Sequence, residues 1–188
     1  MRRSDTPSAS RRELLIFALP ALVLIAAAFV LDDPLQIVEA GLSEIPSTSR
    51  LFAEMRQVID ICHRYEYKSA NFEPVLDEIY NLLGHYDPVH TNNNAGIVVA
   101  ALLLGRHDLE KVISIAVMGG WDTDCNGATA GSIAGAMLGA KQLPEKWIKP
   151  LNDTLQSAII DYHPIAISQC AKWSLEIAQK TKGLEVSA

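Results

Sequence analysis

The stretch of this 188-residue chain that decides its fold runs Met118-Gly-Gly-Trp-Asp-Thr-Asp-Cys-Asn-Gly-Ala-Thr-Ala-Gly-Ser-Ile-Ala-Gly-Ala-Met-Leu-Gly139. Within it glycine recurs every fourth residue, at Gly127, Gly131, Gly135 and Gly139. Because an α-helix has about 3.6 residues per turn, this spacing places the glycines close to one helix face. A glycine inside a helix costs about 1 kcal/mol relative to alanine, so the pattern indicates that another backbone approaches this face closely.

Two carboxylates, Asp122 and Asp124, lie just before the glycines. Two residues apart, they cannot share one face of a regular helix, but in a turn they can converge on one cation. Hard oxygen ligands at the start of a rigid helix suit Mg²⁺ or Ca²⁺. The alternative is that one aspartate caps the helix and the other is solvated, and for an isolated Asp-Thr-Asp this is the simpler interpretation. An EF-hand is excluded, because its other ligand positions and closing glutamate are absent.

Composition indicates a helical chain that does not bind nucleic acid. Hydrophobic residues make up 49% of the chain and aromatic residues 6%, so the core is aliphatic, which favours packed helices. The net charge is −6, and there is no basic stripe of the kind that nucleic-acid-binding proteins carry. Three widely spaced cysteines predict neither a disulfide framework nor a zinc site, and they favour a reducing, cytoplasmic location.

The first residues allow two interpretations. Residues 1–13 form a basic polar leader that we expect to be disordered, and Leu14–Leu31 is an apolar stretch interrupted by Pro20. This pattern is typical of an export signal or a single membrane anchor. The alternative, which we favour, is a buried helix of the core, because the small residues Ala26-Ala27-Ala28 suit close helix packing.

The rest of the sequence predicts a series of helices with short loops and shows no alternating strand pattern. Asp33, Ser47 or Ser49, Asn71 and Asp108 are expected to begin helices, and Gly84 and Gly105 to end two of them. Leu51, Met55, Val58, Ile59 and Cys62 define the buried face of one helix. Further helices are predicted at Ala95–Leu104, Leu109–Met118, Leu151–Ile160 and Ile165–Ala178. The prediction is therefore a single all-α domain over residues 14–182, followed by a tail at 183–188.

A polar loop, His85-Tyr-Asp-Pro-Val-His-Thr-Asn-Asn-Asn94, separates two apolar helices. Loops of this kind often carry function. Its three asparagines are also good helix caps, so both interpretations remain open.

Three segments resemble the ADP-ribosylglycohydrolase family, the group that includes dinitrogenase-reductase-activating glycohydrolase. The most specific is Gly119–Gly139, which resembles the family's C-terminal signature, and the other two are Val89–Gly105 and Leu143–Asn152. The similarity extends roughly from Ala26 to Ala178. It implies an all-α domain with a two-metal cleft, usually for Mg²⁺, that hydrolyses the N- or O-glycosidic bond between ADP-ribose and a protein side chain or small molecule.

The resemblance also implies roles for individual residues. Asp122 and Asp124 match the family's C-terminal pair of metal ligands. Cys125 stands where many members have a ligating threonine, and a thiol is a poor Mg²⁺ ligand, so a water or the Thr123 hydroxyl can take that place. The substrate-binding residues that it implies are His90, Thr91, Asn93, Trp121 and Thr123.

One family feature has no match. Members carry a Thr-Asp-Asp cluster near the N-terminus that supplies the other metal ligands and an acidic residue often assigned as the base, whereas Asp32-Asp33 here aligns with an ordinary helix start. We therefore expect the chain to correspond to the C-terminal half to two-thirds of such an enzyme. Impaired hydrolysis, exposed apolar surface and self-association follow as expectations.

Three hypotheses result. The first is a Mg²⁺-dependent hydrolase of this family, acting on an ADP-ribosylated protein or an ADP-ribose-containing small molecule. The second is a binding remnant that keeps affinity for ADP-ribose or metal without turnover. The third is a membrane-anchored helical protein.

Overall fold

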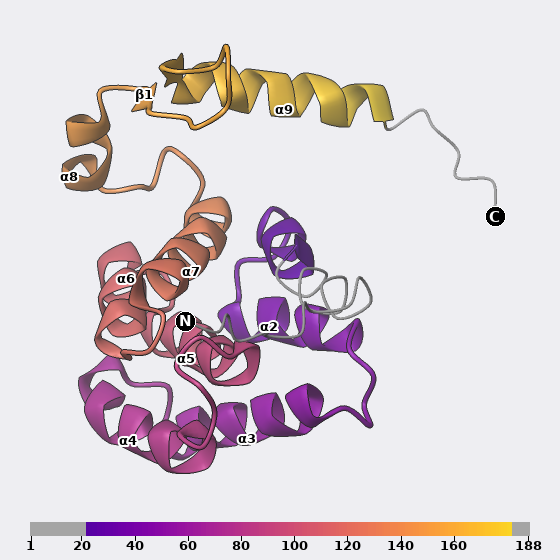
Figure 1. Cartoon of the computed structure of the whole chain (residues 1–188), viewed down its shortest axis with the longest axis vertical. Helices are drawn as coiled ribbons and strands as arrows, with labels where there is room; N and C mark the ends of the chain where they lie inside the picture. Colours follow the sequence, from indigo (N-terminus) through magenta and orange to yellow (C-terminus); the bar gives the residue numbers. More distant parts are fainter. Residues whose placement is uncertain (1–21, 182–188) are drawn as a thin grey trace, which may run out of the picture. The chain divides into compact units, whose positions relative to one another are not determined.

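The computed structural model describes residues 22–181 (Figure 1). The predicted leader, the tail and the first part of Leu14–Leu31 lie outside these residues. Residues 22–28 of that apolar stretch are helical, and Ala28 is buried. None of the helices between residues 22 and 181 combines the length and the apolar character that crossing a bilayer requires.

The chain divides into two compact units, Met1–Gln142 and Leu143–Ala188. In its described part, the first unit is built from helices alone. After the helix at 22–28 these are α2 (Pro34–Ser43), α3 (Arg50–Arg64), the 3₁₀ turn η1 (Ser69–Asn71), α4 (Phe72–Leu83), α5 (Thr91–Gly105), α6 (Leu109–Met118) and α7 (Thr123–Leu138). The predicted all-α fold is confirmed.

The second unit contains α8 (Glu145–Ile148), η2 (Lys149–Leu151), β1 (Thr154–Leu155), β2 (Ile165–Ala166) and α9 (Ile167–Thr181). The helix predicted at Leu151–Ile160 is wrong. Asn152 and Asp153 have positive φ angles of 47° and 48°, which interrupt a right-handed helix. The Asp153 carboxylate then accepts hydrogen bonds from the Ser168 backbone N–H and hydroxyl, and β1 pairs antiparallel with β2.

Most predicted helix starts are confirmed, because short polar side chains cap the exposed N–H groups. Asp33 Oδ1 accepts from the Leu35 N–H at 2.8 Å, Ser49 Oγ from Phe52 at 3.2 Å and Asp108 Oδ1 from Lys111 at 3.2 Å. Gly84 ends α4 as expected.

The start of α5 differs from the prediction. The helix begins at Thr91 rather than Ala95, so the three asparagines lie in its first turn instead of in the loop. The cap is the imidazole of His90, which accepts a hydrogen bond from the Asn92 N–H at 3.1 Å.

Helix α5 is the centre of the first unit. It packs against α2, α3, α4, α6 and α7, and it lies among them in Figure 1. Its residues from Gly96 to Gly105 are all buried, as predicted for a helix that is apolar on every side. The predicted buried face of α3 packs on the same core, and all five of its residues are buried.

The glycine pattern of α7 is explained in part by close packing against α6. A Cβ atom on Gly127 would lie 2.9 Å from Cγ2 of Val117, and one on Gly131 would lie 3.3 Å from Cγ1 of Ile113. A Cβ on Gly135 would have no neighbour within 4 Å among residues 22–181 beyond its own stretch of helix, so helix packing there does not require glycine.

We expect Gly105→Ala and Gly135→Ala to change stability in opposite directions. A Cβ on Gly105 would lie 2.6 Å from the backbone nitrogen of Val112, so Gly105→Ala should lower the free energy of unfolding by about 1–3 kcal/mol. Gly135→Ala should raise it by about 1 kcal/mol through helix propensity. Urea unfolding followed by circular dichroism measures both, and equal effects would contradict this description of the packing.

Candidate functional site

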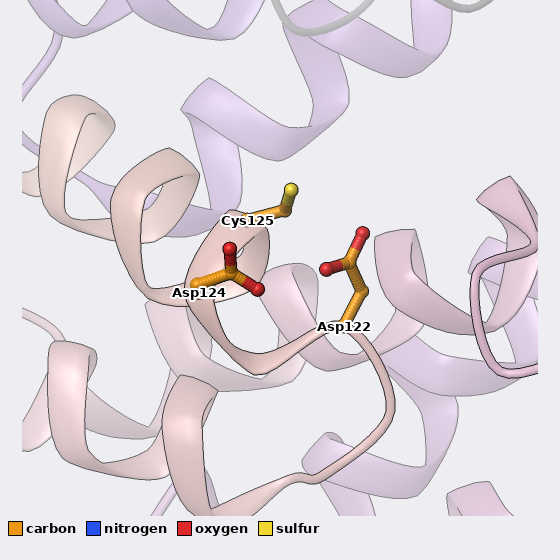
Figure 2. Close-up of side chains that lie close together, drawn as sticks. All are labelled: Asp122, Asp124 and Cys125. Atoms are coloured by element: carbon orange, nitrogen blue, oxygen red, sulfur yellow. The ribbon is translucent and has the colours of Figure 1, made fainter.

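The predicted ligand residues meet at the start of α7 (Figure 2). Asp122 occupies the N-cap position, and Asp124 and Cys125 lie in the first turn. One ligand atom from each of these three side chains lies within 4.8 Å of the other two. The Asp122 carboxylate makes no capping hydrogen bond to α7 and lies beside the Cys125 thiol instead. The geometry thus brings the two carboxylates together, as a cation site requires.

The turn that aims Asp122 is held by Tyr80 of α4. Its hydroxyl donates a 2.8 Å hydrogen bond to the Gly119 carbonyl, and its ring stacks on Trp121 with 4.2 Å between centroids. Gly120 has a φ of +71°, and a Cβ there would lie 2.2 Å from the Tyr80 hydroxyl oxygen. Only glycine fits both the backbone conformation and the space.

A second support comes from the side-chain amide of Asn94 in α5. Its Oδ1 accepts from the Asp122 N–H at 3.1 Å and from Nδ2 of Asn126 at 2.8 Å. Its Nδ2 donates to the carbonyls of Pro88 and His90, each at 2.8 Å. One amide therefore joins the start of α7 to the loop before α5.

A cavity of about 270 Å³ lies beside this junction. Most of its lining is apolar and comes from the helix at 22–28 and from α2, α3, α5 and α7, with Val38, Met55 and Val99 among the lining residues. The polar residues that line it are His90, Thr91, Asn94, Asp122, Cys125, Asn126 and Thr129. The cavity thus combines an apolar lining with a small set of polar groups.

Of the five predicted substrate-binding residues, two line the cavity and three do not. His90 and Thr91 line the cavity, whereas Asn93, Trp121 and Thr123 are not among its lining residues. Asn93 is fully buried and donates a 3.0 Å hydrogen bond to the Asp87 carbonyl, so it holds the loop. Trp121 stacks on Tyr80, and Thr123 is the first residue of α7.

Among the three ligand residues, the Cys125 thiol has a shifted pKa. The hydrogen bond to Asp122 raises the pKa of the exposed Cys125 thiol, and the charges of Asp122 and Asp124 act in the same direction. A neutral thiol beside two carboxylates leaves the oxygen atoms as the hard ligands of the cluster.

Sequence reasoning did not identify Tyr80, Asn94 or Asn126 as parts of the site. Asn126 directly follows the Asp-Thr-Asp-Cys segment, so its position in the sequence could have indicated that it belongs to the site. Asn94 was considered only as the last residue of the polar loop, for which function and capping both remained open, and Tyr80 lies 39 residues before the carbonyl that it binds.

Replacement of Asn94 by alanine should destabilise the first unit. Two donors and two carbonyls lose their partner. Three of the four hydrogen bonds are partly buried, and each buried group left unsatisfied costs about 1–3 kcal/mol. We expect the free energy of unfolding to fall by at least about 2 kcal/mol in a urea titration. The matched control is Asn81→Ala, at an exposed position of α4, where a change within about 0.5 kcal/mol is expected. Equal changes in the two variants would argue against the bridging role of Asn94.

The raised pKa of Cys125 makes its alkylation depend on Asp122. At a given pH a raised pKa lowers the fraction of thiolate, which is the reactive form. Asp122→Asn removes the anionic acceptor and should increase the rate of iodoacetamide labelling at pH 8 with EDTA, by about tenfold for each unit by which the pKa falls.

Mass spectrometry of a Cys170→Ser background measures this rate, because burial raises the pKa of Cys62 to about 12 and protects that thiol. Asp77→Asn on α4 is the control and should leave the rate unchanged. An unchanged or lower rate in Asp122→Asn would show that the carboxylate does not hold the thiol proton.

The comparison with family models gives a match over most of the chain. The family model described as ADP-ribosylglycohydrolase matches residues 15–181. The match begins earlier than the expected Ala26 and includes most of Leu14–Leu31. Neither curated proteins nor solved structures gave a match. Because the match spans most of the chain, this protein belongs to the ADP-ribosylglycohydrolase family.

Proposed function

We propose that the cavity beside α7 binds conjugates of ADP-ribose, and that the chain hydrolyses the glycosidic bond between ADP-ribose and a protein side chain or small-molecule acceptor. The observation that carries the proposal is the convergence of Asp122 and Asp124 next to a cavity that His90 and Thr91 also line. The family membership supports the reaction class.

The carboxylates fit a Mg²⁺ ion by their chemistry, whereas Cys125 does not, because Mg²⁺ prefers oxygen ligands. We propose that Asp122 and Asp124 hold this ion, with a water or the Thr123 hydroxyl in place of the thiol. Among the described residues that line the cavity, Asp122 is the one carboxylate, so this part of the chain offers ligands for one cation rather than two. Bound there, Mg²⁺ would hold ribose hydroxyls and activate a water for attack at the ribose C1″ carbon.

The chain's own residues bind and orient the substrate. His90 and Thr91 provide polar groups at the cavity, and the N–H groups at the start of α7 favour the diphosphate. At about 270 Å³, the cavity is slightly below the roughly 300–1,000 Å³ that is usual for small-molecule pockets. We therefore expect it to enclose part of the ADP-ribose and to leave the acceptor outside.

The test is release of ADP-ribose from N-linked and O-linked ADP-ribosylated peptides in the presence of Mg²⁺. We expect Asp122→Asn and Asp124→Asn each to lower the rate at least about 100-fold, which corresponds to about 2.7 kcal/mol in activation free energy. EDTA should have the same effect, and Asp77→Asn, at an exposed position of α4, should have none.

Calorimetry with ADP-ribose separates the hydrolase from the binding remnant. Binding without turnover at any Mg²⁺ concentration would favour the remnant. Absence of both binding and turnover would remove the proposal altogether.

A further inference from the structure

The ring of His90 is held on two sides where it lines the cavity. Its Nδ1 accepts a hydrogen bond from the Asn92 N–H at 3.1 Å, so the neutral imidazole carries its proton on Nε2. Its face stacks on Tyr86, with 4.2 Å between centroids and 13° between the ring planes. The first contact selects the tautomer, and the second sets the plane of the ring.

Both supports of His90 are tied to one carboxylate, that of Glu54 in α3. The Tyr86 hydroxyl donates to Oε1 at 2.6 Å, and Asn92 Nδ2 donates to Oε2 at 2.5 Å. The hydrogen bond to Glu54 raises the pKa of Tyr86, which keeps its hydroxyl protonated and able to donate. Asn92 is only 5% exposed, and Glu54 is the nearer acceptor of its amide, with the Tyr86 hydroxyl at 3.4 Å as the other.

We propose that Glu54 is a positioning residue for the site: through Tyr86 and Asn92 it holds His90 as an Nε2–H donor at the cavity, where that group binds an acceptor oxygen of the ligand. The identity of this ligand rests on the proposed function. The orientation and tautomer of His90 do not, and they can be tested in the ligand-free chain.

The alternative is that Glu54 only connects α3 to the loop. In that case its loss would lower stability and leave the imidazole tautomer of His90 unchanged. The distinguishing readout is therefore spectroscopic. Long-range ¹H–¹⁵N correlation spectra of the full chain report which imidazole nitrogen of His90 carries the proton. For the wild type we expect the Nε2–H form.

The test variants are Glu54→Gln and Tyr86→Phe. Glutamine keeps the size of Glu54 but replaces one acceptor oxygen by a donor, and phenylalanine keeps the stacked ring but removes the hydroxyl. Both should shift the ¹⁵N signals of His90 and weaken ADP-ribose binding by about tenfold, by analogy with the lower end of the usual effect of losing a partner that orients a metal-binding histidine. Tyr86→Phe keeps the test available if Glu54→Gln does not fold.

Glu78→Gln is a matched control, because Glu78 accepts a 2.8 Å hydrogen bond from the Tyr65 hydroxyl but does not line the cavity. It should leave the His90 signals and the affinity unchanged. Unchanged His90 signals in a folded Glu54→Gln or Tyr86→Phe chain would overturn the proposal. Shifted signals together with no ADP-ribose binding by the wild type would support the positioning role and reject the proposed function.

Discussion

The side-chain amide of Asn94 is the interaction on which the site depends. An amide has two donor hydrogens and an oxygen that accepts two hydrogen bonds, and here all four are used. They connect the loop before α5 with the backbone of Asp122 and the side chain of Asn126. Because three of these four hydrogen bonds are partly buried, solvent does not replace the amide there at equal cost. The position of the carboxylates at α7 is thereby linked to the position of His90.

Three consecutive asparagines carry these connections because they lie in one helical turn. Successive residues of a helix point about 100° apart, so neighbouring side chains reach different segments. Asn92 binds Glu54 of α3, Asn93 binds the Asp87 carbonyl of the loop, and Asn94 binds the start of α7. The buried remainder of α5 makes this turn a rigid support, which is what a site with small angular tolerance requires.

Local chemistry accounts for what could be predicted. Capping by Asp33 and Asp108, the apolar face of α3 and the all-round apolar α5 depend on residues within a few positions of each other, so their patterns are visible in the chain. The prediction at Leu151–Ile160 was wrong because Asp153 pairs with Ser168, fifteen residues later, in place of continuing a helix. The start of α5 was misplaced because the loop asparagines bind distant partners in addition to their local backbone.

The sequence by itself determined the all-α class, the glycine-rich helix and the acidic pair Asp122 and Asp124, because helical periodicity and short motifs are local properties. Only the tertiary structure decided that these carboxylates converge beside a cavity, and that His90 lines the cavity while Trp121 does not. Such choices depend on contacts between helices that lie tens of residues apart, as with Tyr80 and Gly119. No local pattern encodes those contacts, since they arise when α3, α4 and α7 pack around α5.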